Sequence, residues 1–210
     1  MSVANIRRSY DWSELHESNM AAHPIDQLDK WLQDAIRLDV IDPTAMTLAT
    51  VNANGQPSAR IVLLKGLDHK GLVFYTNYMS RKGQDLSNNP QASVLFYWAG
   101  IERQIRVEGT ITKTSYEQSD KYFHSRPLDS RYGAIASPQS LPISREQLEK
   151  RMQETIATSG SQPSRPNFWG GYLLQPQYFE FWQGRKSRLH DRIIYTLTEM
   201  GTWQLDRLAP

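Results

Sequence analysis

Hydrophobic and polar positions change their period several times along this chain. Between Pro24 and Asp42-Pro43, apolar residues recur at helical spacing with charged residues on the opposite face, which predicts an amphipathic helix. From Ala45 onward, short aliphatic and Thr-rich runs are separated by turn residues, and Asn54-Gly55 is a strong hairpin signal. We therefore expect strands over residues 45–51, 58–65, 71–76, 93–98, 103–114, 171–174, 178–183, 193–198 and 203–208.

Helix-start signals lie between these strands. Ser80 is placed to cap a short helix that runs to about residue 87, and Ser115 is placed to begin a helix that carries Tyr122 and Arg126 one turn apart. Residues 144–158 predict a further helix, and residues 159–167 are a loop rich in Ser, Pro and Gly. Many short strands in succession with helices at the sides favour a mainly β protein, an antiparallel barrel with flanking helices, over a doubly wound sheet.

Composition narrows the class of protein further. A chain of 210 residues with 39% hydrophobic and 22% charged residues is typical of one globular domain. The net charge of +2 argues against nucleic acid or an anionic membrane as the main partner, and the absence of cysteine excludes disulfides and thiol chemistry. The amino terminus lacks the apolar core of a secretory signal, and no apolar run approaches membrane-spanning length. These features predict a soluble, cytoplasmic protein.

The chain contains none of the common short motifs for phosphate, metal or acyl chemistry. G-x-G-x-x-G, G-x-x-x-x-G-K-[ST], H-E-x-x-H and G-x-S-x-G are all absent from the sequence. The five histidines are scattered without metal-ligand spacing, so no metal site is predicted. A phosphate ligand would therefore have to be held by side chains.

Basic side chains that suit such a ligand occur in clusters. Arg60 and Lys65 stand at the two ends of one apolar strand, and a regular strand points them to opposite faces. They can then serve two different anions, or a bend can bring them together. The alternative is that both are edge charges on a core strand. Ser80-Arg81-Lys82 lies at a helix start, where two cations are unfavourable unless an anion binds there. Smaller polar sets are Tyr122, Arg126 and Ser130, then Gln104, then Gln139-Ser140.

Another cationic group lies near the carboxyl terminus. Arg188, His190 and Arg192 alternate, and Trp182 precedes them. If this segment is a strand, all three side chains project from one face, as a site for an anionic or electron-rich ligand requires. The alternative is a solvated edge strand with ordinary basic residues.

Taken together, these segments resemble the pyridoxamine 5′-phosphate oxidase family, also called the pyridoxine 5′-phosphate oxidase family. The resemblance extends over nearly the whole chain from about Pro24 and returns weakly in Ile6–Tyr10; the intervening stretch matches nothing that can be aligned. The matching stretches are Arg60–Lys65, Val73–Asn77, Ser80–Lys82, Glu102–Gln104, Lys121–Pro127 with Ser130, Gln139-Ser140, Phe168–Gly171, Glu180–Gly184, Arg188–Arg192 and Asp206–Pro210.

The resemblance implies a split β-barrel that binds FMN and works as a homodimer, with both flavin sites at the subunit interface. It divides the chain into a flexible N-terminal arm, residues 1–23, and an FMN-binding split-barrel domain, residues 24–210. Arg60 and Lys82 are implied to pair with the flavin phosphate, and Trp182 is implied to contact the ring. The full set of implied FMN ligands is Arg60, Ile61, Val62, Leu63, Lys65, Tyr75, Thr76, Arg81, Lys82, Gln104, Gln139, Ser140, Trp182 and Arg192.

The resemblance also implies the reaction. Pyridoxamine or pyridoxine 5′-phosphate is oxidised at C4′ to pyridoxal 5′-phosphate, with hydride transfer to flavin N5. Dioxygen reoxidises the flavin and yields hydrogen peroxide, and the amine substrate also releases ammonia. Arg188 and His190 are implied to be catalytic, with His190 the better candidate for proton handling. The implied substrate-binding residues are Lys65, Tyr122, Arg126, Ser130, Arg188, His190, Arg7 and Tyr10.

Two other functions compete with this interpretation. One is a flavin- or vitamer-binding protein on the same barrel that does not turn over, and the other is a related flavoenzyme of the phenazine-biosynthesis type that acts on a larger substrate. Loss of the substrate-phosphate residues would favour either alternative. Because Lys65, Tyr122, Arg126 and Ser130 are all present beside the flavin set, the sequence favours the oxidase.

Overall fold

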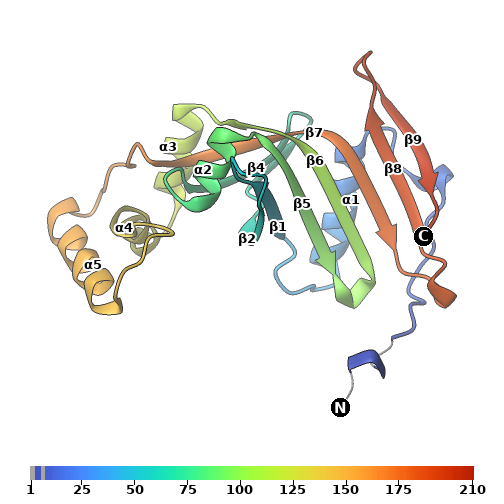
Figure 1. Ribbon diagram of the computed structural model, residues 1–210, viewed down its shortest axis with the longest axis horizontal. Coiled ribbons are helices and arrows are strands. Elements are labelled where there is room, and N and C mark those ends of the chain that lie inside the picture. Colours follow the sequence, from blue (N-terminus) through green and yellow to red (C-terminus); the bar gives the residue numbers. More distant parts are fainter. Residues whose placement is uncertain (1–2, 6–7) are drawn as a thin grey trace.

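The computed structural model describes residues 3–5 and 8–210 and shows a curved antiparallel sheet with helices along it and a further pair of helices beyond one end (Figure 1). The strands are β1 Ala45–Val51, β2 Pro57–Leu63, β3 Gly66–Asp68, β4 Gly71–Asn77, β5 Gln91–Trp98, β6 Arg103–Lys113, β7 Trp169–Gln183, β8 Asp191–Leu197 and β9 Trp203–Leu208. The α-helices are α1 Pro24–Arg37, α2 Arg81–Asn88, α3 Tyr116–Ser125, α4 Leu128–Ala136 and α5 Arg145–Ser159.

The sheet divides along its longest strand. Its main path runs β2-β1-β5-β6-β7-β4-β3, and β8 and β9 branch from β7. The first half of β7 pairs with β4 and the second half pairs with β8, while β6 pairs with both halves. The sheet curls until β2 contacts β4. The mainly β fold with flanking helices and the split barrel are therefore confirmed.

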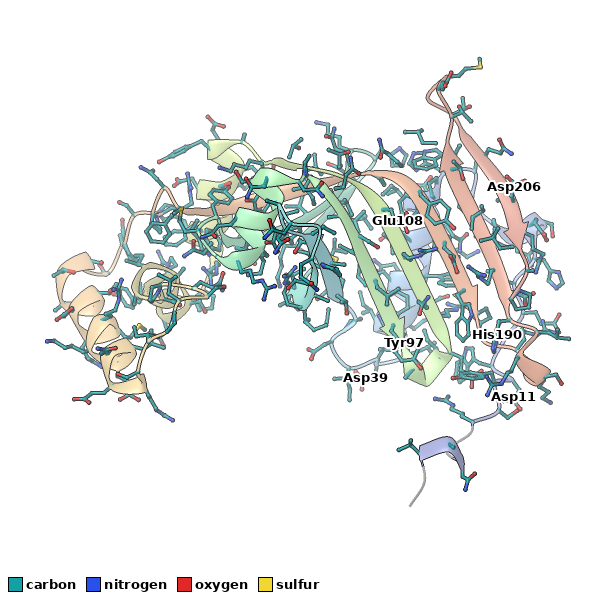
Figure 2. The ribbon with its side chains drawn as sticks, in the orientation of Figure 1. Asp11, Asp39, Tyr97, Glu108, His190 and Asp206 are labelled. Atoms are coloured by element: carbon teal, nitrogen blue, oxygen red, sulfur yellow. The ribbon has the colours of Figure 1, made fainter. Side chains whose placement is uncertain are left out.

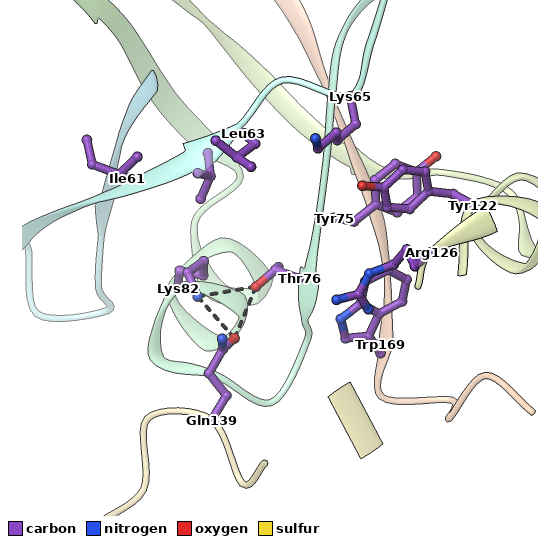
Figure 3. Close-up of a pocket in the computed structure, with 11 residues that line it drawn as sticks. Ile61, Leu63, Lys65, Tyr75, Thr76, Lys82, Tyr122, Arg126, Gln139 and Trp169 are labelled. Carbon is purple, nitrogen blue, oxygen red and sulfur yellow. Dashed lines mark hydrogen bonds between the residues drawn. The ribbon is translucent and has the colours of Figure 1, made fainter. Parts of the chain in front are cut away.

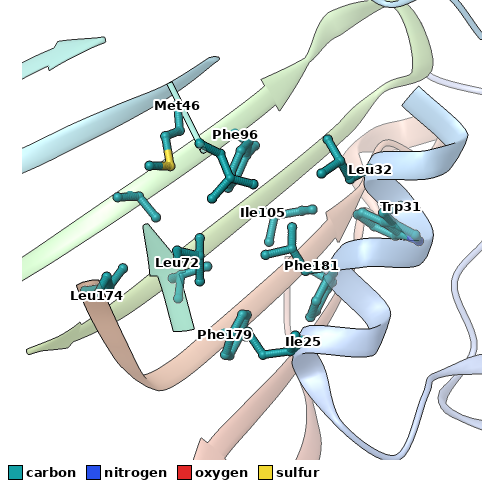
Figure 4. Close-up of a cluster of buried hydrophobic side chains, with 14 of the residues drawn as sticks. Ile25, Trp31, Leu32, Met46, Leu72, Phe96, Ile105, Leu174, Phe179 and Phe181 are labelled. Carbon is teal, nitrogen blue, oxygen red and sulfur yellow. The ribbon is translucent and has the colours of Figure 1, made fainter. Parts of the chain in front are cut away.

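Helix α1 covers one open side of the curled sheet (Figure 4). Its apolar face buries Leu28 and Trp31, and the Trp31 ring meets Phe181 of β7 edge-to-face with 5.2 Å between centroids. Phe96 and Ile105, on β5 and β6, are fully buried in the same core. This alternation of buried and outward residues leaves the opposite face of β5–β8 free to carry polar groups.

The predicted helix starts are confirmed by their caps. The Ser80 side chain accepts a hydrogen bond from the Gly83 amide, and the Ser115 side chain accepts one from the Gln118 amide. Ser144 begins α5 with a complete capping box. The hairpin turn at Asn54-Gly55 joins β1 to β2 as predicted, with Gly55 at φ 80°.

Two of the predicted strands are one. Residues 171–174 and 178–183 lie in the continuous strand β7, so the break expected between them is wrong. Pro176 lies between the two runs and weakens the local strand signal, because proline cannot donate to a ladder. Here it falls between the β4-paired and β8-paired halves, opposite a bulge at Glu108/Gly109, so only β6 flanks it.

The segment from Arg188 to Arg192 is not the continuous alternating strand that the sequence analysis considered as one possibility. Residues 186–188 form a 3₁₀ turn, and β8 begins only at Asp191. Ser187 and Arg188 have φ of 57° and 62°, a left-handed conformation that reverses the chain. Arg188 and His190 therefore project from a loop, and only Arg192 of the three lies on the strand.

Two local predictions near the basic clusters need correction. The strand expected over residues 58–65 ends at Leu63, and the chain bends through Leu64-Lys65 into β3. Helix α3 ends at Ser125, so Arg126 is its extended C-cap. Helix α4 is an element that the sequence analysis did not predict; its local helical signal is weak, since Pro127 precedes it and Gly133 lies within it.

The described part of the N-terminal segment contacts the barrel. Leu15 is buried, and its backbone N–H donates to Asp191 over 3.0 Å. Glu102 accepts from the Trp12 backbone N–H over 2.9 Å and from Arg8 over 3.1 Å. Within residues 3–5 and 8–210, no helix is both long and apolar enough to cross a membrane. The domain boundary at residue 23 and the cellular location stay predictions.

Candidate functional site

A cavity of roughly 290 Å³ lies between the bend after β2, strand β4, the α3–α4 corner and the segment after α4 (Figure 3). We call it the Lys65 pocket. It collects most of the residues implied to hold the two phosphates and the flavin. Its lining residues are Ile61, Val62, Leu63, Lys65, Tyr75, Thr76, Lys82, Tyr122, Arg126, Gln139 and Trp169.

Lys82 is the most buried cation of this pocket. Its Nζ lies 3.2 Å from Thr76 Oγ1, 3.2 Å from Gln139 Oε1 and 3.3 Å from Ser80 Oγ, all uncharged acceptors. Burial lowers the pKa of Lys82, and the nearby Arg60 guanidinium lowers it further. No carboxylate of the described residues pairs with this buried ammonium, which is costly, so this position suits an anionic ligand.

Arg60, on β2, is not among the residues that line the cavity. Its guanidinium donates to the Leu48 carbonyl over 3.2 Å, to Thr50 Oγ1 over 2.7 Å and to Ser58 Oγ over 2.7 Å. Asp85 lies 3.8 Å from Arg60 Nη2 and accepts from Thr50 Oγ1 over 2.7 Å. These contacts fix the position of Arg60, and from there its positive charge lowers the pKa of Lys82.

Stacked aromatic rings form the other wall. Tyr75 and Tyr122 stack with 3.7 Å between centroids, and Trp169 stacks beyond Tyr75 at 5.7 Å. The Arg126 guanidinium lies 4.7 Å from the Trp169 centroid. Arg126 Nη1 is buried and has no hydrogen-bond partner among the described residues. Burial lowers the pKa of Arg126, which nevertheless stays charged at any working pH.

A second cavity, of roughly 520 Å³, lies at the turn between β7 and β8. We call it the Arg188 pocket. Tyr10 meets the Trp182 ring edge-to-face at 5.7 Å and the His190 ring at 5.4 Å. The Trp182 and His190 centroids lie 4.7 Å apart. The lining residues are Arg8, Ser9, Tyr10, Trp182, Arg185, Ser187, Arg188 and His190.

A backbone hydrogen bond determines which ring nitrogen of His190 carries the proton. The Arg185 backbone N–H donates to His190 Nδ1 over 3.1 Å, so the neutral ring carries its proton on Nε2. Burial lowers the pKa of His190, the Arg188 charge lowers it further, and Asp191 opposes both. His190 is therefore a neutral Nε2–H donor near pH 7.

We expect Arg188→Gln to raise the pKa of His190, because it removes a nearby positive charge. In the wild type the folded pKa lies below the unfolded value of about 6.5. When the pH falls below about 6.5, the unfolded chain therefore binds a proton at His190 before the folded chain does. This difference decreases the free energy of unfolding of the wild type as the solution becomes more acidic. An NMR titration, with the His190 resonance assigned from His190→Gln, measures the shift. An unchanged or lower pKa contradicts the assignment.

The residues implied to contact the flavin ring form one row across the sheet. The ladder pairs Tyr97 with Gln104, Gln104 with Trp182, and Trp182 with Arg192, so all four side chains share one face. Figure 2 shows Tyr97 and His190 toward the same end of the sheet. Tyr97 is 54% exposed, and sequence reasoning gave it no role.

The remaining predicted site residues lie beside or outside these cavities. Ser130, on α4, lines a neighbouring cavity that shares Arg126, Gln139 and Trp169 with the Lys65 pocket. Arg81 and Ser140 are exposed, and Arg7 lies outside the described residues. Sequence reasoning also gave no role to Trp169, although its Phe168–Gly171 stretch was part of the family resemblance.

The two pockets lie at opposite ends of β7. Trp169, the first residue of this 15-residue strand, lines the Lys65 pocket, and Trp182, near its end, lines the Arg188 pocket. At about 3.3 Å per residue, an extended strand of this length spans about 45 Å. The described residues of one chain therefore do not bring Arg188 and His190 into one cavity with Lys65 and Arg126.

The fold also gathers groups that the sequence did not suggest as a cluster. Ligand atoms of His23, Asp26 and His69 lie within 4.8 Å of one another. The two imidazoles stack with 4.2 Å between centroids and 7° between planes, so one ion cannot lie in the plane of both rings. His69 Nε2 and Asp26 Oδ1 are 2.7 Å apart, which makes this a hydrogen-bonded pair.

A split barrel whose pocket combines three cations, one of them buried, with stacked aromatic rings is typical of proteins that bind phosphorylated aromatic ligands. Two family models cover most of the chain: "Pyridoxamine 5'-phosphate oxidase" matches residues 32–159, and "Pyridoxine 5'-phosphate oxidase C-terminal dimerisation region" matches residues 169–210. The chain belongs to the pyridoxine/pyridoxamine 5′-phosphate oxidase family.

Individual relatives agree with this assignment. A Bordetella petrii protein named pyridoxine/pyridoxamine 5′-phosphate oxidase is 57% identical over the full length of both chains, and one from Paraburkholderia phytofirmans is 54% identical over 100% of this chain and 99% of its own. PhzG from Burkholderia lata, solved with tetrahydrophenazine-1-carboxylic acid, superimposes with a TM-score of 0.89 at 31% identity and covers 97% of this chain and 100% of its own. An FMN-binding protein from Nostoc punctiforme shares the fold, with a TM-score of 0.73 at 20% identity over 91% of this chain and 100% of its own.

Proposed function

We propose that this protein is an FMN-dependent oxidase that converts pyridoxine or pyridoxamine 5′-phosphate to pyridoxal 5′-phosphate. The observation that carries the proposal is the content of the Lys65 pocket. Lys65, Lys82 and Arg126 line it together, and no Asp or Glu of the described residues does. Three cations without a counter-charge suit ligands that bring phosphates.

The residues present fit FMN. Among the described residues Lys82 has only neutral partners for its buried ammonium, and Arg60 lies close enough to add its field, so both suit the flavin phosphate. Ile61 and Leu63 are 63% and 43% exposed on β2 and offer an apolar edge to a flat ring. When bound, FMN would accept a hydride from the substrate C4′ and pass the two electrons on to dioxygen, which yields hydrogen peroxide.

The substrate phosphate has its own candidate partners. Arg126 Nη1 is a buried donor without a partner among the described residues, and Lys65 and Tyr122 line the same cavity. Separate cations can then bind the two phosphates: Lys82 binds the cofactor phosphate, and Arg126 binds the substrate phosphate. Two anchored phosphates fix the relative orientation of the two rings, which is the main catalytic contribution expected of this chain.

Arg188 and His190 would then complete the site over the substrate ring. Arg188 stays charged and orients the substrate. His190 donates from Nε2, because the Arg185 amide holds Nδ1 as an acceptor. His190 therefore holds a proton toward the substrate oxygen or nitrogen, which favours a role as hydrogen-bond donor over one as general base.

A homodimer supplies the complete site. The Arg188 pocket and the Lys65 pocket lie at opposite ends of β7, so each site is proposed to combine one pocket from each of two chains. The exposed side chain of Tyr97, which lies in the row with Gln104, Trp182 and Arg192, provides apolar surface for a second copy. The match of residues 169–210 to a dimerisation region supports this arrangement.

The test is anaerobic addition of pyridoxine 5′-phosphate to the FMN-loaded protein. We expect the visible flavin band to bleach and to recover when air is admitted, while pyridoxal 5′-phosphate accumulates. Pyridoxine without phosphate is the control, and it should bleach the band at least tenfold more slowly because charge-assisted phosphate contacts contribute roughly 1.5–3 kcal/mol. A yellow protein that bleaches with neither compound refutes the substrate assignment and favours a binding protein or a phenazine-type flavoenzyme.

A further inference from the structure

A buried acid, Glu180, lies next to the row formed by Gln104, Trp182 and Arg192. Glu180 precedes Trp182 by two residues on β7 and therefore points from the same face. It is 3% exposed, so its carboxylate is removed from bulk water. Neither the motifs of the sequence nor the proposed chemistry gives Glu180 a function.

Glu180 binds two arginines at once. Arg192 Nε donates to Glu180 Oε1 over 2.8 Å, and Arg192 Nη2 donates to Oε2 over 3.1 Å, a bidentate pair. Arg106 Nη2 donates to Oε2 over 2.6 Å, and Arg106 Nη1 also contacts Glu108 at 2.8 Å. The charges therefore alternate in sign across β6, β7 and β8, from Glu108 to Arg192.

The contacts leave Arg192 with little freedom. Its Nη1 donates to the Ala209 carbonyl over 2.8 Å, so three of its five N–H groups have partners among the described residues and its plane is defined. The two other N–H groups of Arg192 can donate to a ligand that lies against the row of Gln104, Trp182 and Arg192. Burial alone raises the pKa of Glu180, but the hydrogen bonds from Arg192 and Arg106 outweigh it and lower the pKa, so the carboxylate stays ionised.

We propose that Glu180 is a positioning residue, which holds the Arg192 guanidinium in the orientation that meets the flavin ring. This inference rests on the proposed function, because it takes Arg192 as a flavin ligand. Arginine has about 2 kcal/mol of side-chain rotamer entropy, which a fixed carboxylate removes before the ligand arrives. Without Glu180, Arg192 and Arg106 would also repel each other across β7.

Three variants and one double variant test the proposal. Glu180→Gln keeps the shape and removes the charge, Glu108→Gln makes the same change at the far end of the network, and Arg192→Lys removes the bidentate partner. FMN-loaded proteins are diluted, and the fluorescence of released FMN gives the dissociation constant. The visible absorption maximum of bound FMN and the thermal midpoint are recorded in parallel.

We expect Glu180→Gln to raise the FMN dissociation constant about tenfold, equivalent to about 1.4 kcal/mol, and to shift the absorption maximum. Glu108→Gln should stay within about twofold of the wild type, because its exposed ion pair contributes little. In the Arg192→Lys background, adding Glu180→Gln should change the constant by less than about twofold, because Glu180 acts through Arg192.

Other results overturn the inference. An undiminished effect of Glu180→Gln in the Arg192→Lys background shows that Glu180 acts independently of Arg192. Wild-type FMN affinity and spectrum in Glu180→Gln, with or without a lower thermal midpoint, show a structural role only. If Glu180→Gln does not fold, Glu180→Asp, which keeps the charge but shortens its reach, replaces it in the same comparisons. A wild-type chain that binds FMN but fails the bleaching test refutes the proposed substrate and leaves the Glu180 result interpretable.

Discussion

Mixing two inactive variants will restore activity if each site is built from two chains. Arg126→Ala damages the Lys65 pocket, and Arg188→Ala damages the Arg188 pocket at the other end of β7. A heterodimer of the two variants has one site with both defects and one site with none. Random reassortment makes half of the dimers heterodimers, so the mixture should reach about a quarter of wild-type activity. Each variant alone should lose at least about a hundredfold in kcat/KM.

A matched pair from a single pocket is the control for this experiment. Arg188→Ala mixed with His190→Ala cannot generate an intact site, because both changes fall in the Arg188 pocket. Differently tagged chains, co-purified through both tags, establish that heterodimers have formed. Tagged heterodimers of Arg126→Ala and Arg188→Ala that stay inactive would refute the shared site, and so would a monomer by light scattering that turns over.

Replacing Lys82 by methionine is expected to stabilise the protein without FMN while weakening FMN binding. The ammonium is buried among Thr76, Ser80 and Gln139, none of which is charged, and Arg60 adds repulsion. Removing it should raise the free energy of unfolding of the apo-protein by about 1–2 kcal/mol. Loss of a charge-assisted bond should raise the FMN dissociation constant roughly tenfold to a hundredfold.

The pH dependence gives this prediction a definite sign. The folded pKa of Lys82 lies below the unfolded value, so in the interval between them the unfolded chain binds more protons than the folded chain. The free energy of unfolding of the wild-type apo-protein should therefore rise with pH across that interval, and Lys82→Met should lack this rise.

Denaturant melts with and without FMN, repeated at several pH values, measure both effects. Lys150→Met is the matched control, because this lysine is exposed on α5 and weakly paired with Glu154 at 4.0 Å. It should change neither stability nor FMN affinity appreciably. A Lys82→Met protein that is less stable without FMN, or that binds FMN as tightly as the wild type, would contradict the assignment.

Local signals in the chain were sufficient for most secondary structure. The aliphatic and Thr-rich runs, the Asn54-Gly55 turn and the serine caps act over a few residues, and the turn and the three caps appear in the fold as expected. The errors arose where distant contacts override local preference. Pro176 lies inside β7 because only β6 flanks it there, and α4 forms although Pro127 and Gly133 weaken its signal.

The candidate site divides in the same way. The sequence by itself determined which side chains are available, namely the basic clusters around Lys65 and Lys82 and the group from Trp182 to Arg192, because residue type and short spacing carry that information. Only the tertiary structure decided how they meet. A left-handed turn, and not a strand, places Arg188 and His190 beside Trp182. Strand pairing over the length of β7 separates that group from the Lys65 pocket, because a long strand holds its two ends apart and its register is set by distant partners.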